Sequence, residues 1–242
     1  MKFSIVIPTL NEVKLLPNLL KQLNDIKLRD KYDYEIIISD GGSTDGTQEV
    51  ALSEADKLTA HTEKTRQNIS QGRNAGVEVA EGDWLVFLNG DVVISDISLF
   101  FEKLDLYCNK NLFAGITFAV RVNQEEEKLL DKIFLSFYNY YFHFLNIIKM
   151  GMSRGECMVI SRGLFNELNG FNEQLFAGED FDLFTRVRKH GKVKFIYNPV
   201  ICESPRRYRK EGHFKILFTW LANSISVFVS KKSISKEWEE VR

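Results

Sequence analysis

The stretch FSIVIPTLNE at residues 3–12 begins with a short apolar run and passes through Pro8 into polar residues. An apolar, β-branched run stopped by proline predicts a buried strand over Phe3–Ile7. Leucines then recur at helical spacing, so we expect a helix from about Glu12. A strand followed at once by an amphipathic helix is the first unit of an α/β fold.

The same pattern recurs further along the chain. The apolar run Glu35–Ser39 ends in the loop DGGSTDG at Asp40–Gly46, and a helix is expected from about Thr47 to Ala55. Repeated strand–helix units predict a mostly parallel sheet covered by helices. The further elements expected here are a strand over Lys57–His61, a helix capped by Ser70 and ending near Glu81, and a strand over Trp84–Leu88.

Polar side chains follow three of these strands at the point where each strand ends. Thr9 and Asn11 follow the first strand, Asp40 follows the second, and Asn89-Gly90-Asp91 follows Trp84–Leu88. Ligands of parallel α/β sheets bind at the carboxyl ends of the strands. The sequence therefore predicts one shared site at this edge of the sheet.

The second half of the chain is less regular, and no repeat or linker marks a boundary. We therefore expect a single domain over residues 1–242, made of a first half (1–91), a second half (92–205) and a basic, amphipathic C-terminal extension (206–242). The elements expected are helices over Ser98–Tyr107, Gly163–Leu168 and Asp180–His190, strands over Leu112–Val122 and Lys194–Tyr197, an uncharged aromatic run at Ile133–Ile148, and an amphipathic stretch at His213–Ser230.

Composition excludes several classes of protein. The 242 residues are 44% hydrophobic and 27% charged, which is typical of a globular protein and not of a disordered or fibrous one. Charge is unevenly distributed: residues 1–180 hold 18 basic and 27 acidic side chains, whereas residues 181–242 hold 14 and 6. A basic end suits phosphates or an anionic membrane surface. No nucleic-acid recognition motif accompanies it, so nucleic acid is not an expected partner.

Cysteine, histidine and glycine patterns narrow the chemistry. Three widely spaced cysteines without a CxxC pair favour buried thiols in a reducing cytosol. The four histidines form no HxxxH pair, which disfavours a zinc hydrolase. The loop Asp40–Gly46 matches neither the P-loop nor the dinucleotide-binding motif. No signal peptide precedes the first strand and no run of 18 apolar residues occurs, so we expect a cytoplasmic protein, with peripheral association with the inner face of the membrane as an open alternative.

Three features could carry chemistry, and each also has a plain structural interpretation. Asp91 could hold a hard cation against a diphosphate, or could simply follow an Asn-Gly turn. Glu179-Asp180 could include a general base, or could stabilise a helix N-terminus. The cluster Arg206–Lys210 could contact phosphates or lipid head groups, or could be a solvated face.

In combination these motifs are far more specific than they are alone. FSIVIPTLNE, then ISDGGSTDGT at 38–47, GRNAG at 72–76, GDWLVFLNGD at 82–91 and GED at 178–180 occur in one order at ordinary spacings. The chain resembles the family 2 glycosyltransferases of the GT-A fold over roughly residues 3–200, and is most similar to small single-domain members with the DGGSTDGT loop. The resemblance implies a Rossmann-like α/β sheet and inverting transfer from a nucleotide-diphosphate sugar, with a UDP- or GDP-sugar as donor. It also implies that residues 1–91 are the nucleotide-sugar-binding half and residues 92–205 the acceptor-binding half.

The resemblance also implies roles for particular residues. Asp40 would accept from the imide N–H of the base, and Arg73 would lie near the pocket. Asp91 would bind Mg²⁺ or Mn²⁺ as the last residue of the DxD motif, with His213 as an extra ligand. Asp180, beside Glu179, would be the catalytic base that removes the acceptor's hydroxyl proton. The remaining residues of the nucleotide-sugar pocket would be Pro8, Thr9, Asn11, Glu12, Asn89 and Gly90.

One departure and several alternatives stay open. Asn89 replaces the first Asp of DxD, which implies weaker metal binding or binding through Asp91 alone. The acceptor is not readable from the sequence; if it is lipid-linked, Arg206 and Arg207 would meet lipid phosphates or the acceptor diphosphate. A non-catalytic nucleotide-sugar-binding or scaffold protein is the first alternative. A sugar-phosphate nucleotidyltransferase is disfavoured, because those proteins usually have a Gly-rich, Arg/Lys-containing loop after the first strand.

Overall fold

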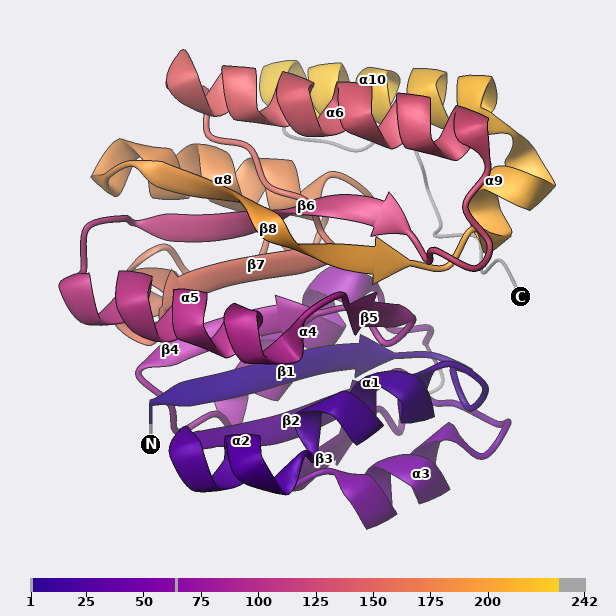
Figure 1. Ribbon diagram of the computed structural model, residues 1–242, viewed down its shortest axis with the longest axis vertical. Helices are drawn as coiled ribbons and strands as arrows, with labels where there is room; N and C mark the ends of the chain where they lie inside the picture. The colour runs from indigo at the N-terminus through magenta and orange to yellow at the C-terminus, as the bar shows by residue number, and fades with distance from the viewer. Residues whose placement is uncertain (1, 64, 231–242) are drawn as a thin grey trace.

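The computed structural model describes residues 2–63 and 65–230, whose strands form one eight-stranded sheet in the order β3-β2-β1-β4-β7-β6-β8-β5. The sheet runs vertically through the molecule, and helices cover it on both sides (Figure 1). The strands are β1 (Phe3–Thr9), β2 (Tyr34–Asp40), β3 (Lys57–Ala60), β4 (Trp84–Leu88), β5 (Val92–Ile94), β6 (Gly115–Val122), β7 (Cys157–Ser161) and β8 (Val193–Glu203).

Strand directions differ between the two ends of the sheet. Strands β3, β2, β1 and β4 are parallel neighbours, whereas β7 runs antiparallel to both β4 and β6. Strands β6 and β8 are parallel, and β5 adds an antiparallel edge. The expected α/β fold with a mostly parallel sheet is confirmed. Its first half is joined to its second by the β4–β7 ladder, from Trp84 opposite Ser161 to Leu88 opposite Cys157.

Alternate residues of β1 show why its sequence is apolar throughout. Phe3, Ile5 and Ile7 pack on one face with α1, α2, α3 and α5, while Val6 packs on the other with α4, α7 and α8. A strand buried on both faces has no polar face, so period-two alternation is absent. These helices are α1 (Leu16–Leu23), α2 (Ile26–Lys31), α3 (Thr47–Glu54), α4 (Ile69–Glu78), α5 (Ile97–Lys110), α7 (Arg162–Glu167) and α8 (Glu179–His190).

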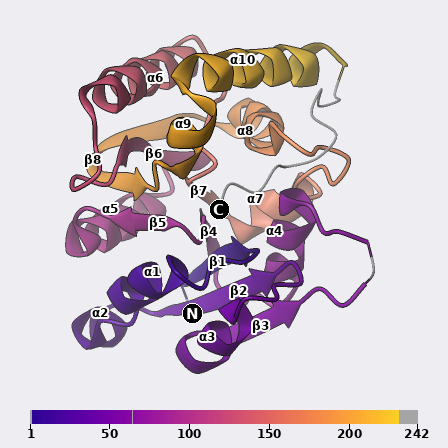
Figure 2. The same cartoon turned by 90° about the vertical axis from the view of Figure 1, so that its right-hand side faces the viewer.

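Two long helices, α6 (Leu129–Ile147) and α10 (His213–Ser230), lie side by side over the end of the sheet that holds β6 and β8 (Figures 1 and 2). Their inner aromatic residues contact each other, with the rings of Tyr138 and Trp220 5.3 Å apart. The short helix α9 (Arg206–Glu211) leads from β8 into α10. Within the described part of the chain, no helix combines the length and the hydropathy that a bilayer-spanning segment needs.

The boundaries of several elements differ from those expected. Helix α1 starts at Leu16 rather than near Glu12, and Asn11 before it takes a left-handed φ of 56°. Asn68, not Ser70, caps α4, in a capping box with Gln71. The uncharged run 133–148 forms most of α6, and α10 matches the amphipathic stretch; the rest of the expected extension, 231–242, lies outside the described residues. Four elements were not expected from the sequence, and all are six residues or shorter: α2, α9, β5 and β7.

Candidate active site

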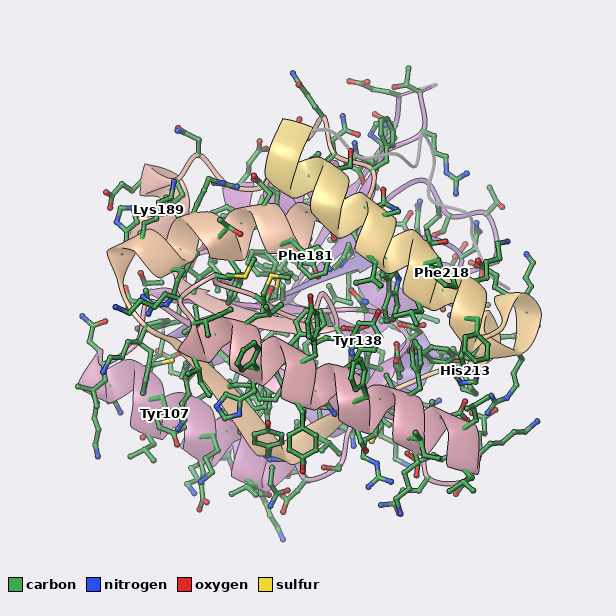
Figure 3. All side chains as sticks on the ribbon, turned by 90° about the horizontal axis from the view of Figure 1, so that it is seen from above. Tyr107, Tyr138, Phe181, Lys189, His213 and Phe218 are labelled. Atoms are coloured by element: carbon green, nitrogen blue, oxygen red, sulfur yellow. The ribbon has the colours of Figure 1, made fainter. Side chains whose placement is uncertain are left out.

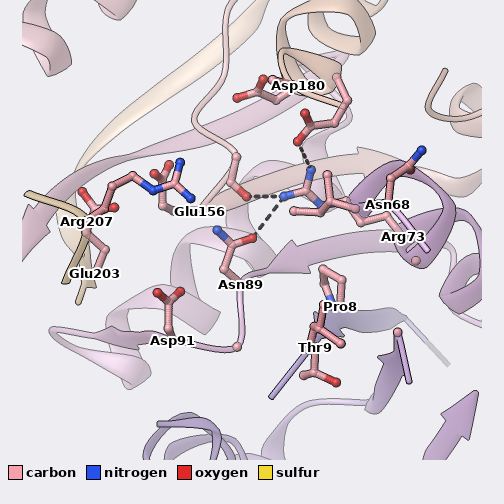
Figure 4. Close-up of a pocket in the computed structure, with 18 of the residues that line it drawn as sticks. Pro8, Thr9, Asn68, Arg73, Asn89, Asp91, Glu156, Asp180, Glu203 and Arg207 are labelled. Atoms are coloured by element: carbon pink, nitrogen blue, oxygen red, sulfur yellow. Dashed lines mark hydrogen bonds and ion pairs between the residues drawn. The ribbon is translucent and has the colours of Figure 1, made fainter. Parts of the chain in front are cut away.

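A pocket lies at the carboxyl ends of β1 and β4 (Figure 4). This is the edge of the sheet at which the sequence placed the polar strand ends. Residues at the starts of α4, α8 and α9 and on α6 and α10 also line the pocket. Of the site residues expected from the sequence, all but Asp40 and His213 line it: Pro8, Thr9, Asn11, Glu12, Arg73, Asn89, Gly90, Asp91, Glu179, Asp180, Arg206 and Arg207.

Two loops are joined by hydrogen bonds at the mouth of the pocket. The backbone N–H of Asn11 donates to Ser43 Oγ at 2.8 Å, and Asn11 Oδ1 accepts from the N–H of Thr44 at 2.9 Å. The N–H of Glu12 donates to Thr47 Oγ1 at 2.8 Å. The hydroxyl-rich loop after β2 therefore fixes the backbone that carries Asn11 and Glu12.

Asp40 lies fully buried beneath this loop. Its Oδ1 accepts from the N–H groups of Gly42 and Ser43 and from Gln48 Nε2, at 2.7–3.0 Å, and its Oδ2 accepts from the Thr9 hydroxyl at 3.0 Å. In this arrangement the carboxylate orders the loop, and it does not line the pocket. Recognition of a nucleobase by Asp40 stays a prediction that would require one of these donors to give way.

Arg73 connects three elements at the back of the pocket. Its guanidinium, 1% exposed, donates through Nη1 to Glu179 Oε1 at 2.7 Å and through Nη2 to Asn89 Oδ1 at 3.1 Å and the carbonyl of Gly155 at 2.8 Å. A buried charge is tolerated only when it is paired and hydrogen-bonded; the two Nη nitrogens meet that requirement, whereas the buried Nε has no hydrogen-bond partner among the described residues. Arg73 therefore positions Asn89 and Glu179 relative to each other.

Close packing of α4 on the sheet brings Arg73 to this position. A Cβ atom added at Gly76 would lie 2.4 Å from Val6 Cγ1, so α4 approaches β1 at a distance that only glycine permits. Gly76 of GRNAG thus has a structural reason that is separate from ligand binding.

Asp180 lies in the first turn of α8, which follows Gly178 in a left-handed conformation with φ of 80°. Its Oδ1 accepts from the N–H of Phe181 at 2.9 Å. Burial and then the neighbouring Glu179 charge raise the pKa of Asp180 to about 8, against the opposing charge of Arg73. A Cβ atom added at Gly155 would lie 3.4 Å from Asp180 Oδ2, so this glycine leaves space beside the carboxylate.

Asp91 faces a cation from the C-terminal part of the chain. Arg206 Nη2 lies 3.1 Å from Asp91 Oδ2 and 2.9 Å from Glu12 Oε1, so one guanidinium bridges two carboxylates. Burial, and next the charge of Asp91, raise the pKa of Glu12 to about 7 in spite of Arg206. The sequence analysis predicted contacts of Arg206 with acceptor or lipid phosphates; in the structure Arg206 contacts Glu12 and Asp91 at the strand ends.

The residues around Asp91 fit a divalent metal that the protein binds through few of its own side chains. Mg²⁺ is usually held by one or two carboxylates together with substrate phosphates. Asp91 can supply one carboxylate, while the amide oxygen of Asn89 already accepts from Arg73. Across the described residues, no group of three or more His, Cys, Asp or Glu side chains could hold a metal ion. The site therefore fits a cation that takes most of its ligands from a bound diphosphate.

His213 lies elsewhere, which corrects its assignment as an extra metal ligand. Its Nε2 is 2.7 Å from Asp131 Oδ1, and its ring stacks on Tyr208 at 5.1 Å between centroids. Arg209 pairs with the same buried Asp131. The aromatic neighbours and the shared carboxylate hold His213 in the packing between α6 and α9. Within the cluster Arg206–Lys210, Arg206 and Arg207 line the pocket, Arg209 pairs with Asp131, and Lys210 is exposed, so the cluster is not one solvated face. Phosphate binding by Arg206 and Arg207 stays a prediction.

The sequence analysis missed a second charged group in the pocket. Arg154, 3% exposed, donates through Nε and Nη2 to Glu156 at 3.1 Å and lies 3.6 Å from Glu203 Oε1, which also accepts from the Tyr208 hydroxyl. Burial and the charge of Glu156 raise the pKa of Glu203. Burial opposes ionisation of Glu156 as well, but the charge of Arg154 and the hydrogen bonds that Glu156 accepts together lower its pKa. Figure 4 shows Arg207 beside Glu203. The available signal was Arg154-Gly-Glu156 directly before an apolar run.

The sheet order and this pocket define an α/β protein of the GT-A type. The model of the family described as "Glycosyl transferase family 2" matches residues 4–168, and the chain belongs to this family. The expected family and fold are thus confirmed.

Individual relatives agree with this membership. A "PGL/p-HBAD biosynthesis glycosyltransferase" of Mycobacterium tuberculosis is 40% identical over 93 residues, which are 37% of this chain and 35% of that protein. The "O-antigen chain rhamnosyltransferase RfbN" of Salmonella typhimurium is 26% identical over 91% of this chain and 74% of its own. The match to the first of these therefore spans about a third of the relative's length.

A solved structure shows the same fold. Glucosyl-3-phosphoglycerate synthase from Mycobacterium tuberculosis, in complex with Mn²⁺, UDP and phosphoglyceric acid, superposes with a TM-score of 0.65 at 17% identity, covering 95% of this chain and 78% of that one. At this identity the likeness concerns the fold.

Proposed function

We propose that the chain transfers a sugar from a UDP- or GDP-sugar to an acceptor hydroxyl, with inversion at the anomeric carbon. The observation that carries the proposal is Asp180: a carboxylate of raised pKa beside space that Gly155 leaves open, in the same pocket as the strand-end residues. Family membership supports the proposal, as does the complex of glucosyl-3-phosphoglycerate synthase, which has the same fold, with UDP and Mn²⁺.

The roles of this chain's residues follow from their positions. Thr9, Asn11 and Glu12, ordered by the loop after β2, hold the nucleotide part of the donor. The acceptor oxygen attacks the anomeric carbon as the bond from that carbon to the diphosphate oxygen breaks, and the hydroxyl proton passes to a carboxylate oxygen of Asp180. Arg73 keeps Glu179 paired, so that the charge next to Asp180 is held in place. A divalent metal at Asp91, when bound, neutralises charge on the departing diphosphate.

The acceptor belongs to the same proposal. Phe142 of α6 and Trp220 of α10 also line the pocket, together with the carboxylates of Glu156 and Glu203. Aromatic faces with carboxylates suit a carbohydrate acceptor, because its hydroxyls donate to the carboxylates and its apolar faces stack on the rings. We therefore place the chain in the synthesis of a polysaccharide or a lipid-linked glycan, in peripheral contact with the cytoplasmic face of a membrane.

The direct test is a screen for hydrolysis of UDP- and GDP-sugars by the full chain, with Mn²⁺ or Mg²⁺ present. We expect one donor to be hydrolysed slowly without acceptor, and calorimetry to show metal-dependent binding of the matching nucleoside diphosphate. Tight nucleotide-sugar binding with no hydrolysis or transfer would favour the non-catalytic alternative. Absence of any metal-dependent binding of UDP or GDP would overturn the proposal.

A further inference from the structure

We propose that the outer side of α6 and the beginning of α10 form a docking face for an anionic lipid bilayer, which presents a lipid-linked acceptor to the pocket. The inference rests on the proposed function, because it assigns the source of the acceptor. We define the α6–α10 face by its exposed apolar side chains. These are Ile133, Phe137, Tyr140, Phe144, Phe214 and Phe218.

Exposure and spacing make the α6–α10 face continuous. Along α6 its members are spaced three or four residues apart, so they lie on one side of the helix. Phe137 is 62% exposed and Tyr140 is 68% exposed, and Phe218 of the neighbouring helix is also 68% exposed. Exposed apolar patches of this extent mark protein or membrane contacts. At about 1.5 Å per residue the 19-residue helix is long enough to lie in the plane of a membrane interface.

Charge around the α6–α10 face favours anionic lipid over a polar partner. Residues 133–148 contain no Asp, Glu, Lys or Arg, and residues 213–230 contain no acid. The one acid of α6, Asp131, is fully buried with Arg209 and His213. Lys132 and Lys149 stand exposed at the two ends of the uncharged run. Glu125 and Glu126 are exposed in the loop before α6, beyond its N-terminal end. Basic residues at the rim of an apolar face are typical of helices that lie on anionic membranes.

The same two helices connect the α6–α10 face to the pocket. Phe142 is on the inner side of α6, and Trp220 and Asn223 are on the inner side of α10; all three line the pocket. Seen from above, the two helices cover this side of the molecule, with Phe218 and Tyr138 on neighbouring helices (Figure 3). An acceptor anchored in lipid beneath the face would have its polar head group next to the pocket. This continuity distinguishes a lipid surface from a partner that would merely cover the helices.

The experiment is flotation of the full chain with vesicles of phosphatidylcholine, with and without phosphatidylglycerol, at low and high salt. The test variant is Phe137→Ser/Tyr140→Ser/Phe144→Ser. The matched control is Ile26→Ser/Leu52→Ser, whose side chains are 73% and 72% exposed on α2 and α3 at the opposite end of the molecule. We expect wild type and control to float with anionic vesicles. The partition coefficient of the test variant onto these vesicles should be lower than that of wild type by a factor of about ten or more. Lys132→Glu/Lys149→Glu should reduce binding to anionic vesicles alone.

Three outcomes would overturn the proposal. One is equal flotation of the test and control variants. Another is equal binding of wild type to neutral and anionic vesicles, which would remove the commitment to anionic lipid. A third is a wild-type dimer in light scattering that the test variant alone dissociates, without vesicle binding, because a second copy would then cover the face. Melting curves check that each variant is folded. Flotation needs no sugar donor. A lack of vesicle binding would therefore contradict the membrane proposal alone, whereas a lack of nucleotide binding in calorimetry would contradict the proposed function.

Discussion

Arg206 Nη2 lies 3.1 Å from Asp91 Oδ2 while the same nitrogen contacts both oxygens of Glu12, so a residue from the C-terminal part of the chain neutralises the expected metal-binding acid. The contact ties α9 across the ends of β1 and β4. It also means that a cation at Asp91 meets a positive charge already in place. Binding of a metal and position of Arg206 are therefore linked.

Replacing Arg206 should strengthen binding of a metal ion in the absence of nucleotide. In Arg206→Ala, Asp91 and Glu12 lose their shared cation, and we expect Mn²⁺ to bind about tenfold more tightly, which corresponds to about 1.4 kcal/mol. Titration of Mn²⁺ followed by electron paramagnetic resonance measures this directly. Lys210→Ala, an exposed cation on the same helix, is the control. Unchanged Mn²⁺ affinity in Arg206→Ala would show that the guanidinium and the metal do not compete.

Substitutions at the two ends of Asn89-Gly90-Asp91 should have opposite effects. Asp91→Ala should abolish the metal dependence of nucleotide binding, because the remaining amide oxygen of Asn89 already accepts from Arg73. Asn89→Asp keeps that acceptor and adds a charge, so metal dependence should be retained or strengthened. Calorimetry of UDP and GDP with and without Mn²⁺ distinguishes the two variants. Metal-dependent binding by Asp91→Ala that matches wild type would remove Asp91 from the site.

The buried pair of Arg73 and Glu179 should be needed for stability. In Arg73→Met, Glu179 keeps a buried charge without its partner at 2.7 Å, and we expect a loss of about 3–5 kcal/mol in the free energy of unfolding. Lys215, whose side chain is 65% exposed, forms a pair with Glu211 at 3.6 Å, so Lys215→Met should cost less than about 1 kcal/mol. Urea denaturation compares them, and equal losses would contradict the assigned role of burial.

Sequence reasoning was successful where local pattern and global fold agree. The runs Phe3–Ile7 and Trp84–Leu88 are apolar, each has a proline or glycine within two residues of its end, and both are strands of the central sheet. It failed for β7 and β5, because a short buried strand has the same composition as a buried helical segment and its pairing partners are distant in sequence. Cys157–Ser161 was missed for this reason.

The site could be predicted to the extent that its residues follow strand ends and helix starts. Thr9, Asp91 and Asp180 were found in this way, and they line one pocket. The contacts of Arg206 and His213 could not be predicted, because both depend on how α9 and α10 fold back over residues more than eighty positions earlier in the chain. A charged cluster in a sequence does not show which of its members point inward.

Activity should rise with pH toward about 8. Asp180 faces Glu179, Arg73 and Glu156, and burial with the Glu179 charge raises its pKa to about 8, so the base is protonated at lower pH. We expect kcat/KM to fall about tenfold per pH unit below that value. Because the unfolded pKa of Asp is about 3.9, the native state binds the extra proton between about pH 4 and 8, and stability falls as pH rises through this range. Asp180→Asn should flatten this dependence of the melting temperature on pH; an unchanged profile would contradict the raised pKa.

The measurement that tests the central claim most directly is sugar transfer by Asp180→Asn, with donor affinity and melting temperature determined on the same sample. If Asp180 is the base, the variant binds its nucleotide sugar nearly as wild type does, melts at the same or a higher temperature at pH 8, and transfers sugar about 10²–10⁴-fold more slowly. Glu179→Gln should damage turnover less. If folded Asp180→Asn transfers sugar at a near-wild-type rate, then Asp180 only stabilises the N-terminus of α8, and the proposed mechanism is wrong.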